Sequence, residues 1–137
     1  MGEVRITVQI KNSSDEAMLR RKKLAKSKVR SVEVDAVVDT GAVRSVIPET
    51  LMQKLGLMEQ TRIVARFADG RTDTVIMSEP ATMYLLDREV SENFLVMGDE
   101  VLIGQTALEA TDLLVDCHRG KVTTNPDHPN APVIRVR

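Results

Sequence analysis

One carboxylate in this chain stands where it could activate a water molecule. Asp39 ends an apolar stretch, residues 32–38, that reads as an extended segment. A hydroxyl and an unhindered backbone follow at once, because the next residues are Thr40, Gly41 and Ala42. A carboxylate that takes a proton from water works best beside a second carboxyl group that can donate one. The chain carries this tetrapeptide once, so the second carboxyl group must come from elsewhere.

The residues around the tetrapeptide narrow its interpretation. Val37 and Val38 precede it, and residues 46–48 then lead into a helix-like run. Far downstream, residues 101–104 read Val-Leu-Ile-Gly, an apolar strand that ends in glycine before another helix-like segment. On these residues the chain resembles the retropepsin family, the retroviral-type aspartic proteases and their cellular relatives, over about residues 30 to 120. The alternative is a chance turn in an unrelated small β-protein, since Asp and Gly are common in turns.

The resemblance implies a homodimeric aspartic endopeptidase. Two copies of Asp39 would meet on a two-fold axis and share one proton, because like charges about 3 Å apart are not both ionised comfortably. The ionised carboxylate would take a proton from water while its protonated partner polarises the scissile carbonyl. Thr40 would form a hydrogen bond across the interface, and Gly41 would let the backbone approach Asp39 of the other subunit. A non-catalytic binding or assembly module with the same fold is the main alternative.

A hairpin signal follows the tetrapeptide. Residues 61–68 and 72–77 flank an Asp-Gly pair, which favours a two-residue turn. In retropepsins a glycine-bearing hairpin folds over the bound peptide, and we expect that role here; the alternative is an ordinary hairpin with no such role. The residues expected to bind an extended peptide substrate are Ala42, Ala68, Asp69, Gly70, Ile103 and Gly104.

Two positions depart from the retroviral pattern. Retroviral members have an acidic residue directly after the alanine of the motif and an arginine directly after the downstream glycine, and these two side chains pair. Here the matching positions are Val43 and Gln105, so both halves of the ion pair are absent together. We therefore expect a cellular-type branch of the family, with a dimer interface that is weaker or differently held.

The rest of the chain predicts one mostly-β domain over residues 1–137, a small closed acid-protease barrel with one or two short helices. Helices are expected at 48–55 and 105–111, with Leu51, Leu55 and Met58 facing the core. A charged turn is expected at 87–89. The expected strands are 5–10, 32–38, 61–68, 72–77, 82–86, 93–97, 101–104 and 113–116, with the tail 133–137 as a candidate edge strand.

Residues 12–30 form an insertion rich in basic side chains. Ser13 and Glu16 match a capping box, which predicts a helix start with Ser13 as N-cap. A solvated helix or a mobile loop is the favoured interpretation of the basic run, and a docking patch for an acidic partner is the alternative. The cations of the run are Arg20, Arg21, Lys22, Lys23, Lys26, Lys28 and Arg30.

Composition excludes several classes of protein. The net charge of −1 gives no overall attraction to nucleic acid or membrane, and no apolar run approaches the ~18 residues of a membrane span. Aromatic residues make up only 2% of the chain, so the core must be aliphatic. The lone Cys117 excludes an internal disulfide and fits a reducing, cytoplasmic location. Cys117, His118, Asp127 and His128 match no closed zinc pattern, so we expect no metal and no cofactor.

Overall fold

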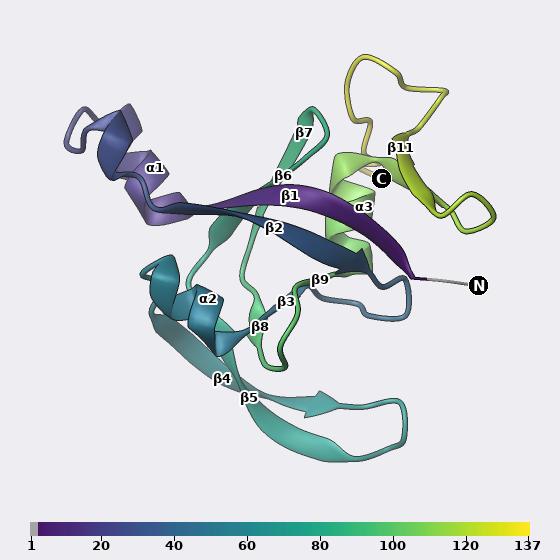
Figure 1. The fold of residues 1–137 in the computed structure, drawn as a ribbon, viewed down its shortest axis with the longest axis horizontal. Helices are drawn as coiled ribbons and strands as arrows, with labels where there is room; N and C mark the ends of the chain where they lie inside the picture. Colours follow the sequence, from purple (N-terminus) through teal and green to yellow (C-terminus); the bar gives the residue numbers. More distant parts are fainter. Residues whose placement is uncertain (1–2) are drawn as a thin grey trace.

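A single curled sheet organises the molecule (Figure 1). The computed structural model describes residues 3–137. Nine strands lie side by side in the order β4-β5-β8-β3-β9-β2-β1-β6-β7. In chain order these strands are β1 (Val4–Asn12), β2 (Ser31–Val38), β3 (Val46–Ile47), β4 (Glu59–Arg66), β5 (Thr72–Ser78), β6 (Ala81–Leu85), β7 (Arg88–Glu92), β8 (Leu95–Val96) and β9 (Leu102–Ile103). A separate two-stranded ribbon consists of β10 (Leu113–Asp116) and β11 (Lys121–Thr124).

Three short α-helices and one 3₁₀ turn connect the strands. They are α1 (Ser13–Arg20), η1 (Lys26–Lys28), α2 (Glu49–Lys54) and α3 (Gln105–Thr111). Within residues 3–137, none of the helices is long and apolar enough to cross a bilayer. The helices expected at 48–55 and 105–111 are confirmed. Gly56 follows the first of them with a φ of +67°, a left-handed conformation that glycine adopts without a steric penalty and that ends the helix.

The longest pairing in the sheet joins β1 to β2. Eight antiparallel partners run from Val4 opposite Val38 to Lys11 opposite Ser31, and the other edge of β1 pairs with β6. Alternation along β1 buries Val8 and Ile10, as a half-buried strand requires. The fully or nearly fully buried core is aliphatic apart from Phe94, and its other large members are Val8, Ile10, Ile47, Leu55, Met83, Leu85 and Ile103.

The mostly-β prediction is confirmed, whereas the closed barrel is not. The strand order has two ends, β4 and β7, and these two edge strands do not pair with each other in the described chain. The strands therefore form an open, half-barrel sheet. Figure 1 shows the β4–β5 hairpin as a long arm at one end of that sheet.

Three strands lie where the sequence pattern predicted none. β3 is one of them, since residues 46–48 were expected only to lead into a helix. β7 begins at Arg88, inside the stretch expected to be a charged turn; the actual turn is Leu86 and Asp87, with Leu86 at a φ of +54°. The guanidinium of Arg88 is buried because it donates to the backbone carbonyls of Thr111 and Asp112. β11 was not predicted either, and the tail 133–137 forms no strand.

Two local expectations are also wrong. The N-cap of α1 is Asn12 and not Ser13, because the side-chain oxygen of Asn12 accepts the N–H of Asp15. Asn12 also donates to the carbonyl of Leu55, which ties the helix start to α2. Met58 is 68% exposed and does not face the core, since the helix that would have placed it there ends at Lys54.

The basic insertion is a folded lobe at the far end of the β1–β2 pair from Asp39 (Figure 1). The carboxylate of Asp15 holds it together by accepting three hydrogen bonds from Arg30, from the backbone N–H at 3.0 Å, Nε at 2.8 Å and Nη2 at 2.9 Å. The bidentate side-chain pairing fixes both ends of the insertion against each other.

Candidate active site

The loop that carries Asp39 connects β2 to β3, and β9 lies between these two strands in the sheet. β2 pairs with β9 in parallel, with Val37 opposite Leu102 and Val38 opposite Ile103, and β9 pairs on its other side with β3. The backbone N–H of Asp39 continues the ladder by donating to the carbonyl of Ile103 at 3.0 Å. The strand expected at 101–104 is therefore present, as β9, and its pairing with β2 fixes the position of the Asp39 backbone.

Backbone groups of the same loop orient the carboxylate. The N–H of Gly41 donates to Oδ1 of Asp39 at 3.0 Å, and the N–H of Ala42 donates to the Asp39 carbonyl at 3.1 Å. A Cβ placed on Gly41 would lie 3.2 Å from Oδ1 of Asp39, closer than an ordinary van der Waals contact. Glycine at this position therefore lets the N–H reach the carboxylate without crowding it.

The start of α3 holds the loop from outside. The N–H of Gln105 donates to the carbonyl of Ala42 at 2.8 Å, and the N–H of Thr106 donates to the carbonyl of Val43 at 3.0 Å. The side chain of Gln105 adds a third bond, from Nε2 to the carbonyl of Thr40 at 2.6 Å. The N–H groups of a first helical turn have no partners within the helix, so these bonds satisfy them while fixing the loop.

Gly104 and Ser45 lock the back of the loop. A Cβ on Gly104 would lie 2.5 Å from the carbonyl carbon of Arg44, so only glycine lets α3 come this close. The hydroxyl of Ser45, which is fully buried, accepts the N–H of Gly104 at 3.0 Å. The glycine that ends the apolar 101–104 stretch is therefore required for steric reasons.

A cavity of about 480 Å³ opens in front of Asp39. Asp39 and Ala42 form one wall, and Ile63, Ala65 and Phe67 of the β4–β5 hairpin contribute to the opposite one. The cavity is mainly apolar, and further apolar lining comes from Val46, Leu95, Met97 and Leu102. A half-buried carboxylate at the edge of an apolar groove is suited to hydrolysis of a bond held within that groove.

The hairpin loop is one residue longer than the sequence predicted. The N–H of Phe67 donates to the carbonyl of Arg71 at 2.8 Å, which leaves three residues between them and makes a 68–70 loop. The N–H of Gly70 donates to the carbonyl of Phe67 at 2.9 Å, and Gly70 has a φ of +87°. A three-residue loop with glycine in the left-handed region is a common alternative to a two-residue turn. The guanidinium of Arg71 lies 4.6 Å from the centre of the Phe67 ring.

The structure divides the residues predicted for the site into three groups. Four of them line the cavity: Asp39, Gly41, Ala42 and Ala68. Thr40, Asp69 and Gly70 are exposed, the last two at the hairpin tip, whereas Ile103 and Gly104 are buried behind the loop. The direct roles proposed for these residues stay predictions.

Sequence reasoning missed the apolar wall opposite Asp39. Ile63 and Ala65 lie on one face of β4, Phe67 directly follows the strand, and Val64 between Ile63 and Ala65 is 69% exposed. Because side chains alternate between the faces of a strand, the odd-numbered residues of the predicted hairpin were the signal that could have identified this wall.

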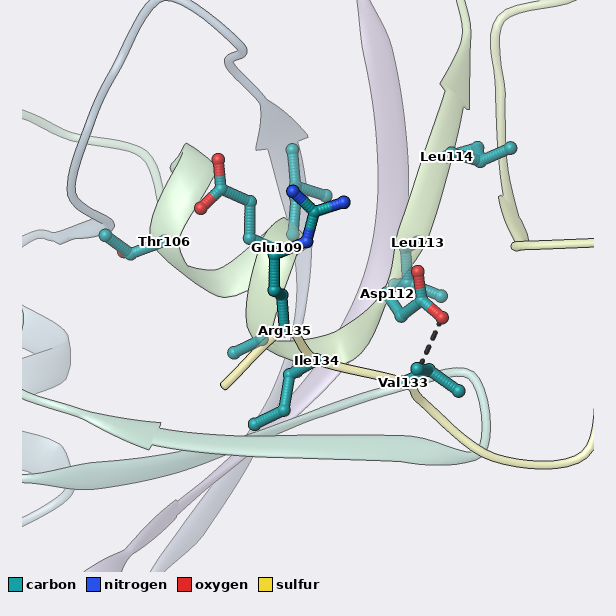
Figure 2. Close-up of a pocket in the computed structure, with 10 residues that line it drawn as sticks. Thr106, Glu109, Asp112, Leu113, Leu114, Val133, Ile134 and Arg135 are labelled. Carbon is teal, nitrogen blue, oxygen red and sulfur yellow. Dashed lines mark hydrogen bonds between the residues drawn. The ribbon is translucent and has the colours of Figure 1, made fainter. Parts of the chain in front are cut away.

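A second cavity, of about 640 Å³, lies away from Asp39 (Figure 2). It separates α3 and β10 from the C-terminal tail and shares no lining residue with the Asp39 cavity. The tail is tied down by the N–H of Val133, which donates to Oδ2 of Asp112 at 3.1 Å. That N–H, followed by Asn125 and His128, lowers the pKa of Asp112 below its ordinary value. Of these two cavities, only the smaller one is lined by residues of the tetrapeptide, namely Asp39, Gly41 and Ala42.

A protein-family model and a solved structure are similar to this chain. The family model described as "gag-polyprotein putative aspartyl protease" matches residues 25–110, the segment from the end of the basic insertion through most of α3. No curated protein matches the chain. Among solved structures, the retroviral protease-like domain of Ddi1 from Leishmania major is similar, with a TM-score of 0.55 and 15% identity over 98% of this chain and 92% of that chain.

The structural likeness supports the fold alone, since the identity is low, whereas the family model covers more than half of the chain. The Asp39 loop, the β9 strand behind it and the start of α3 all fall within the matched residues. The chain belongs to the retropepsin-like family of gag-polyprotein aspartyl proteases.

Proposed function

We propose that this protein is a homodimeric aspartic endopeptidase whose two Asp39 carboxylates, one from each subunit, hydrolyse peptide bonds. The observation that carries the proposal is the placement of Asp39. Its carboxylate is half-buried, accepts the Gly41 N–H at 3.0 Å and borders a mainly apolar cavity of about 480 Å³. Family membership supplies the chemistry that such a carboxylate performs.

The single tetrapeptide supports a dimer. Hydrolysis by two carboxyl groups needs a second Asp close to the first, and the chain has one Asp-Thr-Gly sequence. Thr40 and Gly41 are exposed in the single subunit, so the edge of the loop is free to meet a second copy. A two-fold axis beside this edge would bring Asp39 of the partner subunit next to Asp39.

The mechanism follows from a shared proton. The ionised carboxylate of the pair takes a proton from the attacking water, and the protonated carboxyl polarises the scissile carbonyl. The tetrahedral intermediate then collapses as a proton passes to the leaving amine, and the pair again holds one proton. Thr40 and Gly41 fix the pair in place, and Ala42 keeps the floor of the groove low.

An extended peptide would lie between the Asp39 loop and the β4–β5 hairpin. Ala68, Asp69 and Gly70 would contact its main chain from above, because an exposed hairpin edge can form strand-like hydrogen bonds. Ile103 and Gly104 would support the loop from behind, given their burial.

The test compares wild type with Asp39→Asn against an unbiased peptide library over an acidic-to-neutral pH series. Asp39→Asn should abolish cleavage and leave the dimer intact in sedimentation. Asp99→Asn, which changes an exposed aspartate outside the cavity, is the matched control and should cleave like wild type. Full activity of Asp39→Asn, or activity of a strict monomer, contradicts the proposal. A dimer that cleaves nothing in the library at any pH would favour the non-catalytic binding module.

A further inference from the structure

One peptide group of the Asp39 loop is held from both ends. The Thr40 carbonyl accepts a hydrogen bond from Nε2 of Gln105 at 2.6 Å. The N–H of the same peptide group, which belongs to Gly41, donates to Oδ1 of Asp39 at 3.0 Å. We propose that Gln105 is a positioning residue for the Asp39 carboxylate and acts through the Thr40–Gly41 peptide. This inference rests on the proposed function, since it assigns Gln105 a part in that reaction.

Because the peptide bond is planar, a hydrogen bond to its carbonyl also orients its N–H. The carbonyl and the N–H of one peptide group point in opposite directions in a single plane, so fixing the carbonyl fixes the N–H. Gly41 has no Cβ to restrict its dihedral angles, so this peptide could rotate at little steric cost. An anchor outside the loop is therefore needed to keep the Gly41 N–H directed at the carboxylate.

The backbone of Gln105 is itself held in place. The backbone N–H groups of Gln105 and Thr106 bind the carbonyls of Ala42 and Val43 at 2.8 and 3.0 Å. The following residues of α3, Ala107 and Leu108, are buried in the core. The side chain of Gln105 is exposed, but its backbone is held against the loop that its amide contacts. This distinguishes it from a freely rotating surface glutamine.

The chemistry of the amide suits the position. Gln105 donates without adding a charge next to a carboxylate pair that carries one proton. Val43 stands where retroviral members have an acidic residue, so a cation at position 105 would have no carboxylate to pair with at that position. The two hydrogen bonds form a chain through one peptide group, and each bond in such a chain strengthens the other.

The experiment replaces the amide and leaves the other charges of the site alone. Gln105→Met removes the donor and keeps a long, unbranched, helix-compatible side chain. Gln105→Arg restores an N–H donor of sufficient reach. Gln53→Met makes the same chemical change on the exposed face of α2 and serves as the matched control. The charged residues that line the cavity beside Asp39 are Arg44 and Arg66, and both stay in every variant.

We expect Gln105→Met to lower kcat about three- to tenfold with KM unchanged, as the loss of one hydrogen bond implies. The acid limb of the pH–activity profile should move to higher pH, because the ionised carboxylate loses part of its stabilisation by the Gly41 N–H. Exchange of the Gly41 amide hydrogen, followed by NMR, should accelerate. Gln105→Arg should recover most of kcat, with its acid limb at or below the pH of wild type because the added cation favours the ionised carboxylate. Gln53→Met should match wild type.

Three results overturn the inference. The first is a Gln105→Met variant whose kcat and acid limb match wild type. The second is a Gln105→Met variant in which KM changes and kcat does not. The third is a Gly41 amide hydrogen that exchanges in Gln105→Met at the wild-type rate. If wild type itself cleaves no peptide, the proposed function fails and this role falls with it. If wild type cleaves and Gln105→Met cleaves equally well, the role of Gln105 fails alone.

Discussion

The buried hydroxyl of Ser45 accepts the backbone N–H of Gly104 at 3.0 Å, and this bond joins the end of the Asp39 loop to the turn before α3. The two residues lie 59 positions apart in the chain. The Gly104 N–H is not part of a strand ladder and is buried away from water. The Ser45 hydroxyl therefore supplies its hydrogen-bond acceptor. This buried bond adds to the three hydrogen bonds by which the start of α3 holds the loop.

Replacing Ser45 should destabilise the fold. Ser45→Ala leaves a buried N–H without a partner, which costs about 1–3 kcal/mol of unfolding free energy. Urea unfolding followed by circular dichroism measures this loss. Ser27→Ala, at an exposed position in η1, is the matched control and should change stability little. Equal stability of the two variants would contradict the role of the bond.

The two glycines of the loop should separate stability from activity. Gly104→Ala places a methyl group 2.5 Å from the Arg44 backbone and should cost about 1–3 kcal/mol of stability through overpacking. Gly41→Ala places one 3.2 Å from Oδ1 of Asp39, so it should displace the carboxylate by a few tenths of an ångström and lower kcat about tenfold or more. Thermal unfolding and peptide cleavage, measured on both variants, check this contrast. A Gly41→Ala enzyme with wild-type kcat would show that the contact with Asp39 does not matter.

The Asp15–Arg30 pair should make the basic insertion sensitive to acid. Hydrogen bonds from Arg30 lower the pKa of Asp15, against the opposing effect of burial. A carboxyl group whose pKa is lower in the folded state stabilises the fold above its unfolded pKa of about 3.9, and this contribution is lost as the pH falls through the folded pKa.

Asp15→Asn should therefore be less stable than wild type by about 1–2 kcal/mol at neutral pH, a figure reduced because Arg30 is half exposed. The difference should shrink below about pH 4, where wild type loses the same contribution. Urea unfolding at a series of pH values measures it. Asp99→Asn is the control at an exposed site, and a difference between Asp15→Asn and wild type that stays constant down to pH 2 would contradict the assignment.

The wall opposite Asp39 should act on substrate binding. Phe67→Ala removes apolar lining from the cavity and also the ring that Arg71 covers at 4.6 Å. KM for an apolar peptide should rise about three- to tenfold, since only part of the ring area is available to the substrate. Val64→Ala changes a residue on the other face of the same strand, 69% exposed, and should leave KM unchanged. Steady-state kinetics on both variants decide whether the face of β4, and not the strand in general, binds the peptide.

Local pattern predicted those parts of the molecule that local chemistry determines. The helix at 105–111 begins after Gly104 and its apolar residues have helical spacing, so its boundaries are confirmed. β7 was missed because Arg88 is charged, and its burial is favourable because it donates to carbonyls of the distant residues Thr111, Asp112 and His128. The N-cap of α1 was placed one residue late because Ser13 and Glu16 match a capping box, whereas the true cap is Asn12, the last residue of β1.

In the candidate site, too, the residues that depend on local sequence could be predicted and those that depend on distant contacts could not. Asp39 and its glycine were recognisable from sequence because the turn chemistry is contiguous. Gln105 was noted only for the arginine it replaces, since its contact with the Thr40 carbonyl spans 65 positions and no periodicity reports it. The alternation along β4 was readable, but which face would meet Asp39 depends on how the sheet curls.

The parallel pairing of β9 with β2 also sets when the protein can acquire its loop geometry during folding. Val37 and Leu102, which pair there, lie in the first and last thirds of the chain. Joining such distant segments requires closure of a long loop, whose entropic cost makes the step slow relative to local hairpins. A nascent chain still on the ribosome, with residues beyond 100 not yet released, cannot hold Asp39 in place. The order of synthesis thereby delays the fixing of the Asp39 loop until β9 and the start of α3 have emerged.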